Sequence, residues 1–321
     1  MTSRRARGYR ATLASRGCVL LPRGGGPVSG GVWLHGAIKR TALAAQGLSG
    51  WLAARDPRLV PGTDVDWRPP VSTPAFENWI TTVEDRLGTE VRSWVVNLPA
   101  DRRRRRFNLL LLDRSRKPIA FGKFTANPPN QLALQVLEEF AKNPPGDFWA
   151  PGLLAHGLVE EFSYVVTSAM PNLSHTPARL TWQVRHQLVR EFQESLRHLI
   201  APPSVIVHGD FGPWNVRRLR DGRIAVVDWE ETTEGVVGAD ELWHSVCVHA
   251  SAEPVDRARA LVRAEVPFLS EPQLEAAAGF WLTRLSRPQP QEIDPAIAMP
   301  ARLDAASMRM ERVLAGFGRT A

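Results

Sequence analysis

The stretch Val205–Glu231, VIVHGDFGPWNVRRLRDGRIAVVDWEE, decides what fold is expected of this chain. Asp221-Gly222 stands between two β-prone runs, a pattern typical of a hairpin with a two-residue turn. In such a hairpin Asn215 faces Asp228. Facing residues carry their side chains on the same side, with Cβ atoms roughly 4.5–5.5 Å apart. The spacing therefore predicts that one carboxamide and one carboxylate meet at the open end of the hairpin.

Hard oxygen ligands at that separation suit Mg²⁺, which takes one or two protein carboxylates and completes its sphere with phosphates and water. Asp210 precedes Asn215 by five residues, and Gly212-Pro213 bends the intervening loop. A carboxylate returned to the metal in this way can accept the proton of an attacking hydroxyl. An isolated Asn/Asp pair is usually turn chemistry, but His208-Gly209-Asp210 in register with the hairpin favours a phosphotransferase.

HGDFGPWN followed by VVDWE resembles the aminoglycoside phosphotransferase/choline kinase family, which has the protein-kinase-like fold. The family signature is His-Gly-Asp, four residues, Asn, and then an Asp at the counterpart of the kinase Asp-Phe-Gly. The match is specific over residues 205–242 and weaker from about residue 90 to 320. Residues 1–70 lie outside it.

The resemblance implies that Asp210 is the catalytic base and that Asn215 and Asp228 hold Mg²⁺. It also implies that His208 braces the loop without transferring protons. Glu230 is expected to assist at either the metal or the acceptor site. A separate aspartate, in GADELWH, has two interpretations: Asp240 anchors the catalytic loop as in the family, or it is an ordinary helix cap.

On the nucleotide side, kinase-like folds use a strand lysine to grip the α- and β-phosphates and a helix glutamate to orient it. Lys123, at the end of the apolar run KPIAFGKFTA, is the expected lysine. Glu138 lies near the family spacing for the glutamate, and the adjacent Glu139 is the alternative.

The adenine edge is expected to meet backbone groups around Ser168 to Met170, although Met170 is equally compatible with a core position. No Gly-rich loop covers the phosphates. NLPADRRRRRFN stands in its place, where Arg102 to Arg106 either bind phosphate or form a solvated charge run.

The expected fold is α+β and bilobal, protein-kinase-like, with a small antiparallel-sheet lobe followed by a helical lobe. The expected domains are an irregular N-terminal extension over 1–70, with one helix near 37–54, a nucleotide-binding lobe over 71–170, and a helical lobe with the catalytic loop and acceptor site over 171–321. Strands are expected at 91–98, 106–113, 117–126 and 162–171. Helices are expected at 73–88, 130–143, 180–200, 254–266, 271–286 and 301–315.

Composition narrows the class of partner. The net charge is +7, but it rests almost wholly on arginine, and only Phe107 adjoins the arginine run as a stacking aromatic, so nucleic-acid binding is disfavoured. No run of about 18 apolar residues is present, which argues against a membrane span. Two distant cysteines suit a reducing, cytoplasmic setting.

The sequence thus predicts an ATP- and Mg²⁺-dependent phosphotransferase that moves the γ-phosphoryl group to a hydroxyl or amine of a small molecule. The alternative is a catalytically inactive nucleotide-binding relative, which the missing Gly-rich loop favours. Relatives of this fold use many acceptors, so the pattern leaves the acceptor open.

Overall fold

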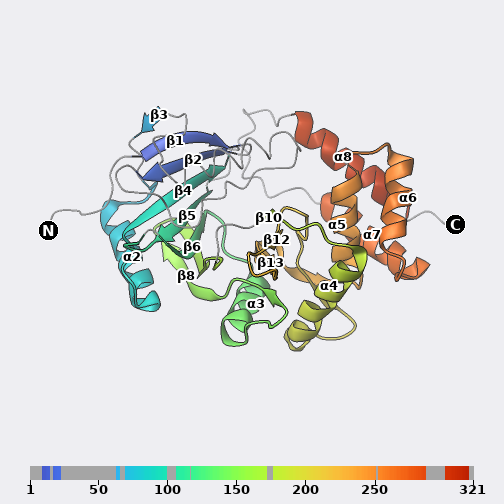
Figure 1. Ribbon diagram of the computed structural model, residues 1–321, viewed down its shortest axis with the longest axis horizontal. Coiled ribbons are helices and arrows are strands. Elements are labelled where there is room, and N and C mark those ends of the chain that lie inside the picture. The colour runs from blue at the N-terminus through green and yellow to red at the C-terminus, as the bar shows by residue number, and fades with distance from the viewer. Residues whose placement is uncertain are drawn as a thin grey trace.

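The computed structural model describes residues 9–14, 17–22, 63–65, 69–99, 106–115, 117–171, 176–250, 252–286 and 301–317. Two lobes lie along the long axis of the molecule (Figure 1), a sheet lobe toward the N-terminus and a helical lobe toward the C-terminus. The expected α+β plan of two lobes is confirmed. The helix expected near residues 37–54 lies outside the described residues.

An antiparallel sheet of eight strands forms the first lobe, in the order β3-β1-β2-β4-β5-β6-β9-β8. Three of its strands come from the first 65 residues, where the sequence predicts irregular structure; short strands with little periodicity gave no clear signal there. The strands are β1 (Tyr9–Ala14), β2 (Gly17–Pro22), β3 (Thr63–Val65), β4 (Ser93–Pro99), β5 (Arg106–Leu112), β6 (Pro118–Thr125), β8 (Leu153–Val159) and β9 (Phe162–Ser168).

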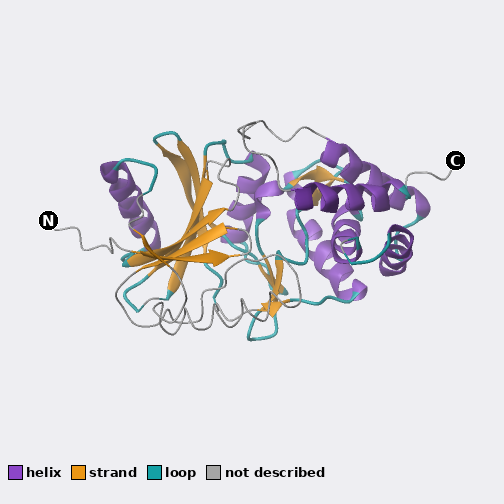
Figure 2. Ribbon diagram, turned by 90° about the horizontal axis from the view of Figure 1, so that it is seen from above, coloured by secondary structure: helices purple, strands orange, loops and turns teal. Residues whose placement is uncertain are grey.

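Helix α2 (Thr73–Leu87) covers one face of this sheet (Figure 2). The sequence favours Thr73 as its cap, but the cap is Ser72, whose hydroxyl accepts from the N–H of Ala75. Gly88, with φ of 61°, ends the helix in a left-handed conformation that glycine adopts without strain. The apolar stripe of α2 packs against buried side chains of the sheet, such as Phe124 and Leu109.

Strand alternation in β6 decides where Lys123 points. Ala120 and Phe124 are fully buried against α2, whereas Lys123 lies on the other face of the strand and is only half-buried. Successive side chains of a strand point to opposite faces. Lys123 therefore faces away from the core of its own lobe.

Between the two lobes lie α3 (Gln131–Lys142) and a small sheet with the order β10-β12-β13-β7. The side chain of Asn130 caps α3 by accepting from Leu132 and Ala133. The strands are β7 (Phe148–Trp149), β10 (Thr176–Pro177), β12 (Val216–Arg218) and β13 (Ile224–Val226).

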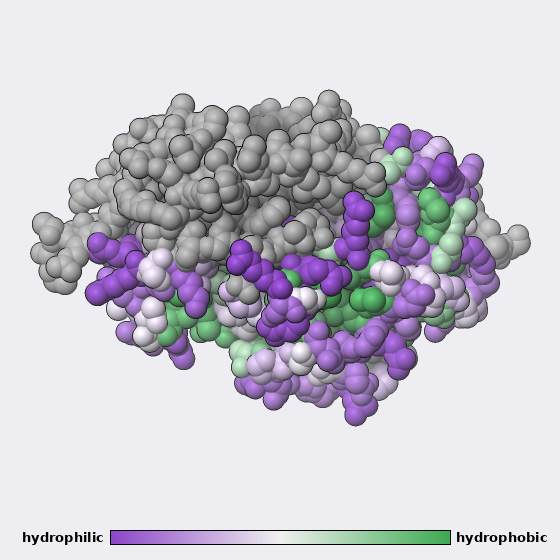
Figure 3. All heavy atoms as spheres, viewed as in Figure 1, coloured by the Kyte–Doolittle hydropathy of each residue, from purple (hydrophilic) through white to green (hydrophobic). Residues whose placement is uncertain are grey.

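The second lobe is mostly helical, and its core is built around Trp281, Leu242 and Val246. No helix among the described residues is long and apolar enough to cross a membrane. On the face shown in Figure 3, hydrophobic residues of the described part form separate patches among hydrophilic ones. The elements are α4 (Trp182–Leu196), η2 (Arg197–Leu199), β11 (Val205–Val207), η3 (Trp229–Glu231), β14 (Thr233–Gly235), α5 (Ala239–His249), α6 (Val255–Glu265), α7 (Glu271–Ser286) and α8 (Ala301–Ala315).

The β12–β13 hairpin forms, but with a register one residue away from the expected one. Val216 pairs with Val226, so Asn215 faces Val227 and not Asp228. The cause is the turn: the N–H of Gly222 donates to the carbonyl of Leu219, and Gly222 adopts a left-handed conformation with φ of 89°. This is a three-residue loop with a glycine bulge in place of the two-residue turn.

Candidate active site

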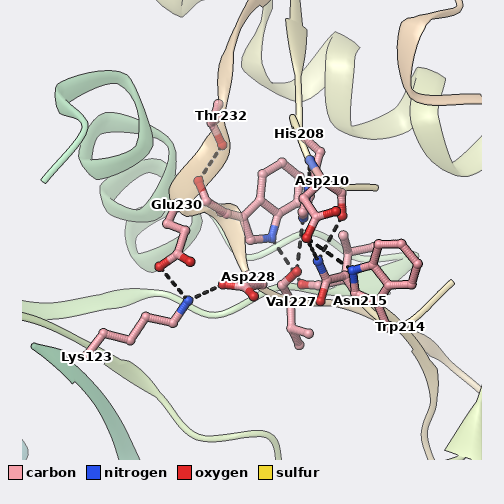
Figure 4. A network of polar contacts seen from close by, with 11 residues as sticks. Lys123, His208, Asp210, Trp214, Asn215, Val227, Asp228, Glu230 and Thr232 are labelled. Carbon is pink, nitrogen blue, oxygen red and sulfur yellow. Dashed lines mark hydrogen bonds and ion pairs between the residues drawn. The ribbon is translucent and has the colours of Figure 1, made fainter. Parts of the chain in front are cut away.

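The loop between β11 and β12 holds Asp210 by several hydrogen bonds. Its carboxylate accepts from the indole N–H of Trp214 at 3.1 Å and from the amide of Asn215 at 2.9 Å. The same Asn215 amide donates to the backbone carbonyl of Asp210 at 2.8 Å. Asp210 and Asn215 are therefore brought together as the sequence predicts, by a loop bent at Gly212 and Pro213 (Figure 4).

Burial makes the Asp210 carboxylate harder to ionise. It raises the pKa of Asp210 to about 6, while the hydrogen bonds from Trp214 and Asn215 pull that pKa down and the charge of Asp228 pushes it up. A carboxylate with this pKa is ionised at neutral pH and is still basic enough to receive a proton.

His208 ties the loop to the end of β13. Its ring is fully buried, and burial lowers its pKa to about 4, so the imidazole is neutral. Nδ1 accepts from the N–H of Asp210 at 3.2 Å, which leaves the proton on Nε2 to be donated to the carbonyl of Val227 at 3.0 Å. Both ring nitrogens are thus used in holding backbone.

Asp240 lies at the start of α5, fully buried, and its carboxylate accepts from the backbone N–H of His208 at 2.8 Å. Gly238 occupies the cap position of α5, so Asp240 contacts the loop of Asp210 and is not the helix cap. Burial raises the pKa of Asp240 to about 8, and its second oxygen, Oδ1, has no hydrogen-bond partner among the residues that the structure describes.

Asp228 directly follows β13 and has a left-handed backbone with φ of 72°. This conformation is uncommon outside glycine and is best tolerated by Asp and Asn. It turns the chain at the end of the strand, and in Figure 4 Asp228 lies between Lys123 on one side and Asp210 with Asn215 on the other. Asp228 thus reaches the site by a turn after the hairpin and not by facing Asn215 across it.

Lys123 bridges from the sheet lobe to this segment. Its ammonium contacts the carboxylate of Asp228 and lies 2.9 Å from that of Glu230. Burial disfavours the charged lysine, but the two carboxylates outweigh it and raise the pKa of Lys123 well above its usual range. The lysine is therefore a permanent cation at the boundary of the lobes.

The glutamate expected to orient Lys123 lies elsewhere. Glu138 is half-exposed and pairs with Lys142 along the same helix, at 3.9 Å. Glu139 accepts from the side chain of Asn143 at 2.7 Å and lies 3.4 Å from His198. The partners of Lys123 come instead from the segment after β13, because α3 turns both of its glutamates toward other residues.

At the expected nucleotide edge, Ser168 ends β9. Its N–H already donates to the carbonyl of Gly152 at 2.9 Å, and its hydroxyl accepts from the N–H of Gly152. The backbone N–H of Ser168 is thus used within the sheet, and the expectation that backbone groups around Ser168 to Met170 meet the adenine edge stays a prediction. Ser168 also lines a hollow of about 290 Å³ with Phe140 and Leu153. Met170 is half-buried in the segment that follows.

The carboxylate of Asp228 and the carboxamide oxygen of Asn215 are ligands that suit a hard divalent cation. The amide nitrogen of Asn215 donates to Asp210, so the amide oxygen points away from Asp210. Among the described residues no three His, Cys, Asp or Glu side chains gather as a metal cluster. A cation here would depend on phosphate and water for its other ligands. Residues 102–105 of the arginine run lie outside the described residues.

Two contacts of the site were missed from the sequence. The hydrogen bond of Trp214 to Asp210 joins residues i and i+4 of a bent loop, and no periodic pattern signals such a bond. The side chain of Asn130 donates to the carbonyl of Thr232 at 2.6 Å and fastens α3 to the segment after β13. The sequence predicts a helix beginning near Asn130, but it does not predict the contact of Asn130 with Thr232.

Comparison with known families adds an independent observation. Residues 161–271 match the model of the phosphotransferase enzyme family APH. The resemblance is confirmed. The matched segment contains the loop of Asp210, the β12–β13 hairpin and α5, which carry the hydrogen-bonded constellation described above.

Among solved structures, aminoglycoside phosphotransferase APH(4)-Ia is 13% identical, with a TM-score of 0.47 over 78% of this chain and 100% of that one. Spectinomycin phosphotransferase APH(9)-Ia, in complex with ADP and spectinomycin, is 10% identical, with a TM-score of 0.41 over 75% and 97%. An amicoumacin kinase in complex with AMP-PNP and Ca²⁺ is 9% identical, with a TM-score of 0.41 over 66% and 86%. No curated protein matches the chain.

Proposed function

We propose that this protein is a small-molecule phosphotransferase that moves the γ-phosphoryl group of a nucleoside triphosphate such as ATP to a hydroxyl or amine. The observation that supports it most is the Asp210 carboxylate, oriented by Asn215 and Trp214 beside the contact of Lys123 with Asp228. Base, cation and candidate metal ligands thus occupy one small region, as phosphoryl transfer requires.

In this proposal Asp210 is the catalytic base. It accepts the proton of the acceptor hydroxyl as the acceptor oxygen forms a bond to the γ-phosphorus. The bond from that phosphorus to the β–γ bridging oxygen breaks, and the nucleoside diphosphate leaves. The hydrogen bonds of Asp210 to Trp214 and Asn215 keep its carboxylate from rotating away from the acceptor.

Asn215 and Asp228 would hold Mg²⁺, which when bound neutralises charge on the phosphates. Lys123 would exchange its carboxylate partners for the α- and β-phosphates of the incoming nucleotide. Glu230 already pairs with Lys123 and therefore competes with the phosphates for its ammonium.

His208 and Asp240 hold the loop of Asp210 through backbone contacts. Backbone groups near Met170 bind the edge of the nucleotide base. The proposed lobes are residues 71–170, whose sheet strands β1, β2 and β3 extend, and residues 171–321.

The direct test is phosphoryl transfer measured as nucleotide consumption over a panel of small hydroxyl and amine acceptors. Asp210→Asn and Asp228→Asn are expected to abolish turnover with any acceptor that the unaltered protein uses. The matched control is Asp85→Asn, the same chemical change on the exposed face of α2. Full turnover in Asp210→Asn protein would show that the assigned mechanism is wrong.

A second candidate is a catalytically inactive nucleotide-binding protein. It is favoured by the contact of Lys123 with Asp228, which engages a carboxylate needed for the metal. Nucleotide binding without loss of the γ-phosphate to any acceptor of the panel would support this candidate over the enzyme.

A further inference from the structure

Arg217 of β12 is a buried cation for which the described residues supply no counter-charge. Only 4% of it is exposed, its Nε has no hydrogen-bond partner, and among the described residues no carboxylate pairs with it. Burial lowers its pKa to about 10 with no opposing charge to raise it. The contrast is Arg185, which is 1% exposed but donates to the carboxylate of Glu265 at 3.1 Å and to its carbonyl at 2.7 Å.

A buried charge that is neither paired nor hydrogen-bonded is costly, and folded proteins rarely keep one without a reason. Arginine carries five N–H donors and no acceptor. A ligand that completes this environment must therefore present acceptor atoms to the guanidinium.

Strand alternation places Arg217 on the same face of β12 as Asn215. Val216 and Val226 point into the core beneath the small sheet, so the residues next to them point the other way. Arg217 is paired with the small Ala225, and Asn215 with Val227. Two residues along a strand correspond to about 6.6 Å. Arg217 thus lies on the same face as the candidate metal ligand Asn215, two residues farther along β12 and opposite the small Ala225.

The direction of β12 indicates on which side of the phosphates the nucleoside lies. Asp210, at which the transferred phosphoryl group must lie, contacts Asn215 at the beginning of β12, and Arg217 lies farther from it along the strand. If the phosphates lie at Asn215 and Asp228, as the proposed function requires, the nucleoside lies toward Arg217. The apolar, half-buried Val227 on this face suits a planar base, whereas Ala225 is fully buried.

We propose that Arg217 hydrogen-bonds to the purine base of the donor nucleotide and gives this site a preference for guanine over adenine. Guanine presents two acceptors, O6 and N7, on one edge, and a guanidinium pairs with both. Adenine presents N7 beside the N6 amino donor, which meets the arginine donors unfavourably. This inference rests on the proposed function and specifies its donor.

The test is the affinity of the protein for non-hydrolysable analogues of GTP and of ATP, each with Mg²⁺, measured by calorimetry. Because a bidentate arginine–guanine pair discriminates by about fivefold or more, the unaltered protein is expected to bind the GTP analogue at least about fivefold more tightly. Arg217→Leu is expected to abolish the difference. Arg218→Leu is the matched control, since Arg218 is exposed and bonds to the carbonyl of Gly222.

Equal affinities in the unaltered protein, or a guanine preference that survives in Arg217→Leu, would overturn the inference while leaving the phosphotransferase intact. Absence of binding by both analogues would remove the donor site and the inference together. Thermal unfolding of the ligand-free protein supplies a second readout. Arg217→Leu removes an uncompensated buried charge and is expected not to lower the melting temperature. A large decrease would reveal a structural partner of Arg217 and contradict the proposal.

Discussion

At the scale of single residues, the ionisation of Asp210 governs the expected pH dependence. Burial raises its pKa to about 6, and a protonated carboxyl cannot accept the proton of the acceptor. The value of kcat/KM is therefore expected to fall about tenfold per pH unit below pH 6 and to be level from pH 7 upward. The measurement is the pH profile of kcat/KM with an acceptor that the protein uses.

The variant Trp214→Phe tests whether Asp210 is the group that titrates. It keeps an aromatic ring in the loop but removes the N–H that lowers the pKa of Asp210. The acid limb is expected to move to higher pH in this variant. Trp182→Phe is the control, since Trp182 stacks on Phe268 and is not bonded to the loop. An acid limb at the same pH in all three proteins would mean that another group titrates.

A backbone position supplies the second prediction. Gly209 has φ of 81°, and a Cβ there would collide with the carbonyl oxygen of Glu231. Gly222 has a similar φ of 89° but open space around it. Gly209→Ala is expected to lower the free energy of unfolding by about 3 kcal/mol, and Gly222→Ala by about 1 kcal/mol, the conformational part alone. Urea denaturation measures both, and equal losses would disprove the collision.

At the scale of elements, the β12–β13 hairpin shows how far local sequence reasoning reaches. Its two runs and its turn were predictable from Asp221-Gly222, but the number of loop residues was not. Asp-Gly serves a two-residue turn as well as a type I turn with a bulge. The structure has the bulge, which shifts the register by one residue. Register depends on turn geometry, and short strands of three residues specify it weakly.

The site was nevertheless largely predictable, because Asp210 and Asn215 are close in the chain and Asp228 is brought near by the hairpin. The partner of Lys123 was not. Glu138 and Glu139 lie on α3, and which face of that helix meets β6 depends on packing between elements distant in sequence. The strands before residue 70 were missed because they are short and show little periodicity, although β1 and β2 are neighbours in the chain and pair with each other.

The start of α5 carries a prediction about stability. The folded-state pKa of Asp240, about 8, exceeds its unfolded value of 3.8, so its protonated form stabilises the fold. That contribution is fully present below the unfolded pKa and is lost as pH rises toward 8. Melting temperatures are expected to fall between pH 6.5 and 8. Asp240→Asn, which keeps an oxygen for the N–H of His208, is expected to flatten this decline. An unchanged slope would assign the decline to other groups.

At the scale of the whole molecule, the two lobes meet through polar contacts made by the segment after β13. Lys123 reaches Asp228 and Glu230 from the sheet lobe, and Asn130 reaches Thr232 from the start of α3. Arg284 of α7 holds the same segment from the other side through the carboxylate of Glu231 at 2.7 Å. One short stretch of chain thus joins Lys123, the candidate metal ligand Asp228 and the helical lobe.

If the proposed function holds, the phosphates of the nucleotide compete with Asp228 and Glu230 for Lys123. The phosphates can engage the lysine only as it gives up carboxylate partners, and Glu230 is the more exposed of the two. Glu230→Gln keeps the shape of the side chain and removes its charge, so the affinity for Mg²⁺ with a non-hydrolysable nucleotide is expected to rise about threefold, within the range of a partly exposed ion pair. Glu234→Gln on the exposed side of β14 is the control.

Titration calorimetry distinguishes this competition from the other role of Glu230. If Glu230 ligates the metal, its amide variant loses a charged oxygen ligand and binds the metal–nucleotide complex more weakly, and the loss should depend on Mg²⁺ concentration. If Glu230 instead restrains Lys123, the gain should persist with the nucleotide alone, because the lysine and not the metal is released. The sign of the change in affinity, with and without Mg²⁺, therefore decides which partner this carboxylate serves.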